Sequence, residues 1–103
     1  MDPKQRIQEI VETNRIVLFM KGTPQFPQCG FSSRTSEALK ASGCEYATVD
    51  VLADPEIRAH LPTYSQWPTF PQLFIDGELV GGCDIVLDLF RSGELQNLIA
   101  GAN

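Results

Sequence analysis

The sequence lacks any long apolar run. The longest uninterrupted one, Ile16 to Met20, is far shorter than the roughly 20 residues that a helix needs to cross a bilayer. The first ten residues mix charges of both signs with glutamine and contain no apolar stretch of the kind that defines a secretory signal. We therefore expect no membrane span and a cytoplasmic location.

Basic residues are also scarce. The 103 residues include 8 Lys and Arg against 13 Asp and Glu, which gives a net charge of −5, and no basic run interrupts this balance. Such a chain repels phosphate backbones, so nucleic acid is not an expected partner. With 43% hydrophobic and 20% charged residues, the composition is that of a globular protein, and chains split into domains only beyond roughly 250 residues. The sequence predicts one domain over residues 1–103.

Cysteine is sparse and widely spaced. Cys29, Cys44 and Cys83 are an odd number with no short spacing between them, which excludes a disulfide framework. Together with the single histidine, His60, they do not form the paired spacing of a structural zinc site. If a cysteine carries chemistry here, it acts singly.

Local signals predict the elements of the first half. Asp2 and Pro3 are a helix start, and the helix continues to residue 13. The apolar run 16–20 is typical of a central strand that is covered on both faces. Residues 21–28, KGTPQFPQ, form a loop before Cys29, and a helix over 30–42 ends at Gly43.

The second half adds a strand, a helix, a hairpin and two further helices. Residues 46–51 predict a strand parallel to the first, since a helix joins them. Asp54 and Pro55 start a helix that we expect Pro62 to close, and the segment 72–82 predicts an antiparallel hairpin that turns at Asp76 and Gly77. Asp84 is placed to cap the next helix, and Gly93 separates it from a last turn or two with Leu95, Leu98 and Ile99. The order predicts an α/β, thioredoxin-like fold, a four-stranded mixed sheet flanked by helices on both faces.

Cys29 is the candidate reactive residue. It follows a loop at the end of the first strand and precedes a helix, where the helix dipole and unpaired N–H groups lower a thiol pKa. Lys21, on the near side of the same loop, adds positive charge. Ser32 stands where a C-x-x-C pair would have its second thiol, so a mixed disulfide needs an external thiol. One thiolate per chain satisfies an iron-sulfur cluster only if a second subunit and two small thiols supply the remaining ligands, which points to glutathione.

The segments KGTPQFPQCGFS and WPTFPQLFIDGELVGGCD closely resemble the monothiol glutaredoxins of the CGFS type, in their single-domain form. The resemblance implies a thioredoxin fold, a glutathione site and a homodimer that bridges a 2Fe-2S cluster. Cys29 of each subunit and the thiol of each glutathione would be the metal ligands. It also implies a role in iron-sulfur cluster assembly and transfer, with a BolA-type protein and apo iron-sulfur acceptor proteins as partners.

The resemblance further assigns roles in binding glutathione, a tripeptide with two carboxylates. Lys21 and Arg58 match cations that meet the glycine carboxylate. Pro71 matches the cis-proline of the family, and the backbone of Phe70 pairs with the glutathione cysteine. Cys83 and Asp84 open a helix whose N–H groups hold the γ-glutamyl carboxylate, and Asp84 meets the amino group. Gly81 and Gly82 are expected to allow the ligand close approach.

Other residues keep open interpretations. Trp67 is either a platform for ligand and partner or an ordinary half-buried aromatic, while Gln66 and Thr69 are expected in the same groove. Phe31 is expected beside a cluster or in the core. Cys44 is interpreted as a buried apolar residue rather than a resolving thiol. His60 is expected on a helix surface.

Three functions remain in view. The first is a cluster carrier, and the second is a glutathione-dependent monothiol oxidoreductase, at most a weak enzyme, in which Cys29 attacks a glutathionylated protein. The third is a redox-sensing adaptor. The long loop before Cys29 and the phenylalanine at Phe31, where strongly catalytic relatives have tyrosine, favour the carrier.

Overall fold

The computed structural model describes residues 1–101. α2 is the longest helix in this range, with 12 residues, and no helix there is long and apolar enough to cross a membrane. The elements in chain order are α1 (Pro3–Thr13), β1 (Ile16–Met20), α2 (Gly30–Ala41), β2 (Ala47–Asp50), α3 (Pro55–Ser65), β3 (Gln72–Ile75), β4 (Glu78–Gly81), α4 (Cys83–Ser92) and α5 (Glu94–Gly101).

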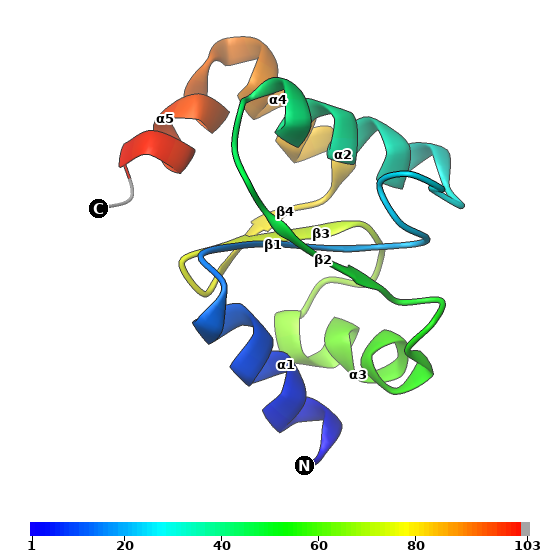
Figure 1. Ribbon diagram of the computed structural model, residues 1–103. Helices are drawn as coiled ribbons and strands as arrows, with labels where there is room; N and C mark the ends of the chain where they lie inside the picture. The colour runs from blue at the N-terminus through cyan, green and yellow to red at the C-terminus, as the bar shows by residue number, and fades with distance from the viewer. Residues whose placement is uncertain (102–103) are drawn as a thin grey trace.

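The four strands form one mixed sheet with the order β2-β1-β3-β4. β1 pairs with β2 in parallel and with β3 antiparallel, and β3 pairs antiparallel with β4. Helices α1 and α3 cover one face of the sheet, while α2, α4 and α5 lie on the other (Figure 1). The predicted thioredoxin-like fold with helices on both faces is confirmed.

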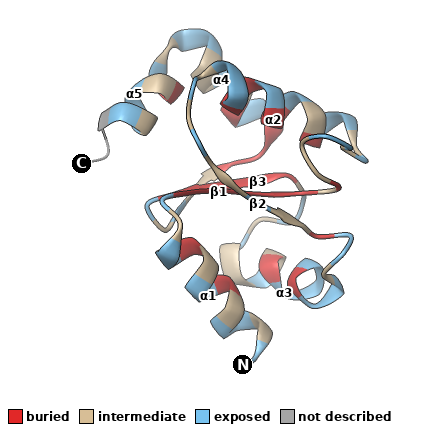
Figure 2. Ribbon diagram, in the orientation of Figure 1, coloured by how far each residue is buried: buried red, intermediate tan, exposed pale blue. Residues whose placement is uncertain are grey.

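β1 lies at the centre of the molecule, and all five of its residues are buried. Their side chains alternate between the two faces. Val17 and Phe19 join the core beneath α1 and α3, and Leu18 and Met20 join the core beneath α2 and α4. Figure 2 shows the buried residues as a layer in the sheet and along the inner sides of the helices. The continuous apolar run thus builds two hydrophobic cores at once.

The turn and helix-end signals are largely confirmed. Asp2 caps α1 and forms a capping box with Gln5. Asp76 and Gly77 connect β3 to β4 with φ of 52° and 79°, the left-handed pair that tight hairpin turns require. Gly93 ends α4 with φ of 83°.

Two predicted helix boundaries were wrong. α3 does not end at Pro62 but continues to Ser65. A proline inside a helix removes one N–H donor, and the remaining bonds of the last turn hold, including that from the N–H of Trp67 to the carbonyl of Pro62 at 3.1 Å. α4 is capped by Gly82 rather than Asp84, because the carbonyl of Gly82 already accepts the N–H of Val86 at 3.0 Å.

Candidate functional site

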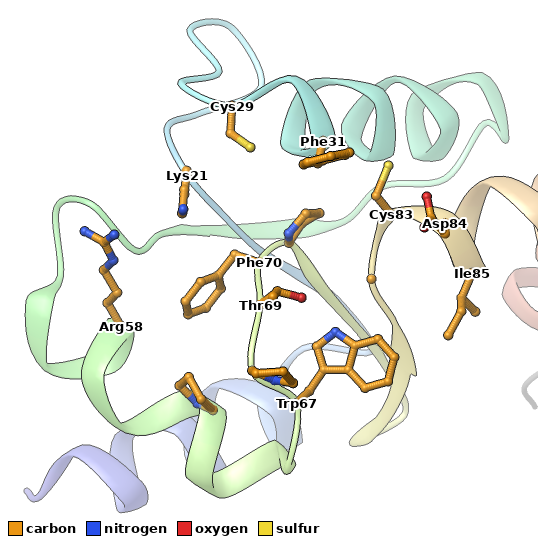
Figure 3. A pocket seen from close by; sticks show the side chains of 14 residues that line it. Lys21, Cys29, Phe31, Arg58, Trp67, Thr69, Phe70, Cys83, Asp84 and Ile85 are labelled. Atoms are coloured by element: carbon orange, nitrogen blue, oxygen red, sulfur yellow. The ribbon is translucent and has the colours of Figure 1, made fainter.

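A cleft of about 780 Å³ opens at the edge of the sheet where β1 ends. The start of α2, one face of α3, the loop before β3 and the start of α4 complete its walls (Figure 3). Its lining residues are Lys21, Cys29, Phe31, Arg58, Pro62, Trp67, Pro68, Thr69, Phe70, Pro71, Gly82, Cys83, Asp84 and Ile85.

The structure brings six of the site residues predicted from the sequence into this one cleft. They come from five separate segments and are Lys21, Cys29, Arg58, Phe70, Cys83 and Asp84. Phe31, Trp67 and Thr69 also line it, whereas Gln66 is exposed outside it with φ of 55°. Proximity makes a joint role chemically possible, and the individual roles remain predictions.

Cys29 is the N-cap of α2 and half-buried at the mouth of the cleft. The pKa of its thiol is lowered, first by the backbone N–H of Ser32 and then by the N–H of Phe31, the hydroxyl of Ser32 and the charge of Lys21. Burial opposes this shift. The helix start therefore favours a thiolate at this position, as the sequence indicated.

Ser32 also has a structural role that the sequence did not reveal. It is completely buried, and its Oγ accepts the backbone N–H of Lys21 at 3.1 Å. This bond ties the end of β1 to the first turn of α2. Since the Oγ is already an acceptor for Lys21, its own proton is available to the Cys29 thiolate.

The loop over residues 21–28 is folded back on itself. Gly22 has φ of +91°, and a Cβ there would lie 2.5 Å from the carbonyl oxygen of Phe26, so only glycine fits. The N–H of Gly22 donates to Asp50 Oδ1 at 2.9 Å, and the N–H of Gln28 donates to the carbonyl of Lys21 at 2.9 Å. Asp50, at the end of β2, thereby fixes a loop that delivers Cys29. Nothing in its sequence neighbourhood signalled this.

The wall opposite Cys29 is the loop over residues 66–71. The Phe70–Pro71 peptide bond is cis, as the resemblance to the monothiol glutaredoxins implied. Within residues 1–101 the backbone N–H groups of Thr69 and Phe70 donate no hydrogen bond. A ligand that lies along this loop can therefore pair with the backbone of Phe70 in the manner of an added strand.

The start of α4 packs closely against this loop. A Cβ on Gly82 would lie 3.2 Å from Trp67 Nε1 and 3.3 Å from the carbonyl oxygen of Pro71. A Cβ on Gly81 would lie 2.7 Å from the side chain of Ile85. The expectation that Gly81 makes room for a ligand was therefore wrong, because its missing side chain makes room for Ile85. Gly82 lines the cleft, but its missing side chain chiefly lets Trp67 and the Pro71 carbonyl pack closely against it.

The charges in the cleft are separated. Lys21 and Arg58 lie together on one side, and Asp84 lies on the opposite side at the start of α4 (Figure 3). In residues 1–101 neither Lys21 nor Arg58 takes part in an ion pair. The cleft therefore has a cationic end, an anionic end next to helix N–H groups, and a thiol between them.

Two residues with open interpretations lie outside the cleft. Cys44 is half-buried, its thiol donates to the carbonyl of Leu39 at 3.5 Å, and burial raises its pKa, which disfavours the thiolate. His60 is exposed on α3, with Nδ1 at 2.8 Å from the carbonyl oxygen of Glu56. Among the described residues, no three His, Cys, Asp or Glu side chains gather as metal ligands.

Comparison with known proteins places the chain in a family. Residues 16–80 match the Glutaredoxin family. The chain is 53% identical over 100 residues to Glutaredoxin 4 of Pasteurella multocida, covering 97% of this chain and 92% of that protein. The solution structure of reduced apo GrxS14 from poplar is 46% identical, with a TM-score of 0.82, and covers 96% of this chain and 91% of its own. A buckwheat glutaredoxin solved as a glutathione complex is 29% identical, with a TM-score of 0.84 and coverages of 96% and 88%. The chain therefore belongs to the glutaredoxin family and is similar to bacterial proteins named Glutaredoxin 4.

Proposed function

We propose that this glutaredoxin is a monothiol, glutathione-binding carrier of a 2Fe-2S cluster. The observation that carries the proposal is the arrangement of the cleft. A single thiol with a lowered pKa lies between a cationic end at Lys21 and Arg58 and an anionic end at Asp84. This order of charges matches glutathione, whose thiol lies between a glycine carboxylate and a γ-glutamyl group.

Each part of glutathione has a chemical counterpart in the cleft. The glycine carboxylate fits the ammonium of Lys21 and the guanidinium of Arg58. The cysteinyl backbone fits Phe70, whose N–H has no partner within residues 1–101. The γ-glutamyl carboxylate fits the N–H groups at the start of α4, around Cys83, and its amino group fits the carboxylate of Asp84. The buckwheat relative, solved with glutathione, supports this choice of ligand.

The cluster follows from the number of thiolates. A 2Fe-2S cluster takes four ligands, and the cleft offers Cys29 as its accessible thiolate. Two subunits that each hold one glutathione supply four thiolates between them. Phe31 is 52% exposed and Ile85 is 38% exposed at the rim, which provides apolar surface for a facing subunit. In this proposal the cluster is cargo, held partly by ligands that can dissociate.

Several finer parts belong to the same proposal. The cluster-loaded form is a homodimer, and the partners that receive or share the cluster are apo iron-sulfur proteins and a BolA-type protein. The site of action is the cytoplasm, where thiols such as Cys29 remain reduced.

The lowered pKa of Cys29 favours a second candidate, a glutathione-dependent oxidoreductase. The Cys29 thiolate attacks the glutathione sulfur of a glutathionylated protein, so that a Cys29–glutathione disulfide forms and the protein thiolate leaves. A second glutathione thiolate then attacks this disulfide, which releases oxidised glutathione and restores the Cys29 thiolate. Ser32 cannot replace the second glutathione because it is not a thiol.

Glutathione titration of the protein by calorimetry tests the shared basis of both candidates. We expect Lys21→Gln and Arg58→Gln each to weaken binding about fivefold, the loss of roughly 1 kcal/mol from a solvent-accessible charge pair. Lys4→Gln, an exposed lysine on α1 outside the cleft, is the control and should bind as the parent protein does. Equal affinity in all four proteins would contradict the assignment of the cationic end.

A further inference from the structure

A fully buried amide stands behind the cleft without lining it. Gln72 is the first residue of β3 and pairs in register with Phe19 of the central strand. None of its surface is exposed, and its neighbours along β3 are all apolar. A glutamine in such a position is uncommon, since buried polar groups require hydrogen-bond partners.

The side chain of Gln72 holds the loop that forms one wall of the cleft. Its Nε2 donates to the carbonyl of Trp67 at 2.9 Å and to the carbonyl of Thr69 at 3.2 Å. An amide nitrogen has two hydrogens, so both are used on this loop. The carbonyls that receive them belong to residues whose side chains line the cleft.

This loop has little else to fix its backbone. Pro68 and Pro71 have no N–H to donate, and the N–H groups of Thr69 and Phe70 donate to nothing in residues 1–101. The N–H of Trp67 belongs to the end of α3, where it bonds to the Pro62 carbonyl. The two bonds from Gln72 are therefore the hydrogen bonds that anchor the middle of the loop to the sheet.

The other end of the amide adds no hydrogen bond to the core. The Oε1 of Gln72 is buried and accepts no hydrogen bond within residues 1–101. Burying this carbonyl group without a partner therefore costs the protein some stability. An apolar side chain of the same length would fill the space without that burden but could not hold the loop.

We propose that Gln72 is a positioning residue that sets the backbone of residues 67–70 for glutathione. This inference rests on the proposed function. Gln72 touches no ligand and acts through the loop, holding the N–H and carbonyl of Phe70 where the cysteinyl part of glutathione pairs with them. Its loss leaves the fold intact and frees the loop.

The test uses Gln72→Met, which keeps the length of the side chain and removes both its donors and the unpaired carbonyl. Gln96→Met is the matched control, because Gln96 also has a buried Oε1 without a partner but lies on α5, outside the cleft. Three quantities are measured for each protein. These are the thermal midpoint, the affinity for reduced glutathione by calorimetry, and the emission maximum of Trp67, the single tryptophan of the chain.

For Gln72→Met we expect a midpoint within a few degrees of that of the parent, because removing the unpaired buried carbonyl offsets the two lost hydrogen bonds. We also expect a shifted Trp67 emission and an affinity for glutathione reduced about tenfold. Gln96→Met should change neither the emission nor the affinity. Affinity within twofold of the parent in Gln72→Met, or a large fall in its midpoint, would overturn the inference. If the parent protein itself fails to bind glutathione, the proposed function is wrong. The loop assignment is then decided by Trp67 emission alone, supported by a shift and overturned by its absence.

Discussion

Replacing Ser32 with alanine removes a hydroxyl that serves two parts of the cleft. Its oxygen accepts the backbone N–H of Lys21, and its proton contributes to lowering the pKa of the Cys29 thiol. The substitution therefore couples a measurable loss of stability to a measurable change in reactivity. Neither effect is expected from an ordinary surface serine.

The magnitude follows from the burial of the bond. Ser32 is completely buried and its bond to the N–H of Lys21 is part-buried, so leaving that N–H without its partner costs about 1–3 kcal/mol. For a chain of this size, a loss of about 2 kcal/mol lowers the thermal midpoint by roughly 8–16 °C. The pKa of Cys29 should rise. It should stay below the ordinary value for cysteine because the N–H groups of Ser32 and Phe31 remain.

The assay is the rate of alkylation of Cys29 by iodoacetamide as a function of pH, in a Cys44→Ser, Cys83→Ser background. The rate follows the thiolate fraction, so the profile of the Ser32→Ala variant should move to higher pH. Ser33→Ala is the control, since Ser33 is the next residue along α2 and is only half-buried. An unchanged profile together with an unchanged midpoint would refute the role given to Ser32.

Two further changes probe elements that frame the cleft. Asp54 caps α3, and the hydrogen bond from Arg6 lowers the pKa of its carboxyl. The stability that the Asp54 carboxylate contributes is therefore fully present above its pKa in the unfolded chain. It is lost as the pH falls through its lower pKa in the folded protein. Asp54→Ala should lower the free energy of unfolding by about 1 kcal/mol at neutral pH and by progressively less in acid, as measured by urea unfolding. A difference between parent and variant that does not change with pH would contradict this. Gly22→Ala should lower the thermal midpoint well below that of Gly43→Ala. Both glycines have positive φ, but only Gly22 would place a Cβ against backbone atoms, so equal midpoints would contradict the close approach at Gly22.

Much of the fold could be predicted because its signals are local. Five consecutive apolar residues identify β1, the Asp76–Gly77 pair identifies the hairpin, and Asp2 with Pro3 marks the start of α1. The position of Cys29 at a helix start was equally local. The grouping of the six site residues in one cleft came from the resemblance to monothiol glutaredoxins, since they lie on five segments that are distant in sequence.

What the sequence did not predict depends on side chains that meet only after folding. Asp50 holds a loop that is distant from it in the sequence, and Gln72 holds the loop just before its own strand from a position that the folded sheet buries; neither has a recognisable motif. Pro62 was misleading because tertiary packing of α3 tolerates the loss of one helical hydrogen bond. We expected the missing side chain of Gly81 to let a ligand approach, whereas in the structure the side chain of Ile85 fills that space.

The most direct test of the carrier proposal is the composition of the cluster-loaded protein. After anaerobic reconstitution with iron, sulfide and glutathione, native mass spectrometry should find two chains, one 2Fe-2S cluster and two glutathione molecules in a single species, in accord with one protein thiolate per subunit. Cys29→Ser should yield neither cluster nor dimer. A cluster that forms without glutathione, or that persists in Cys29→Ser, would contradict the account.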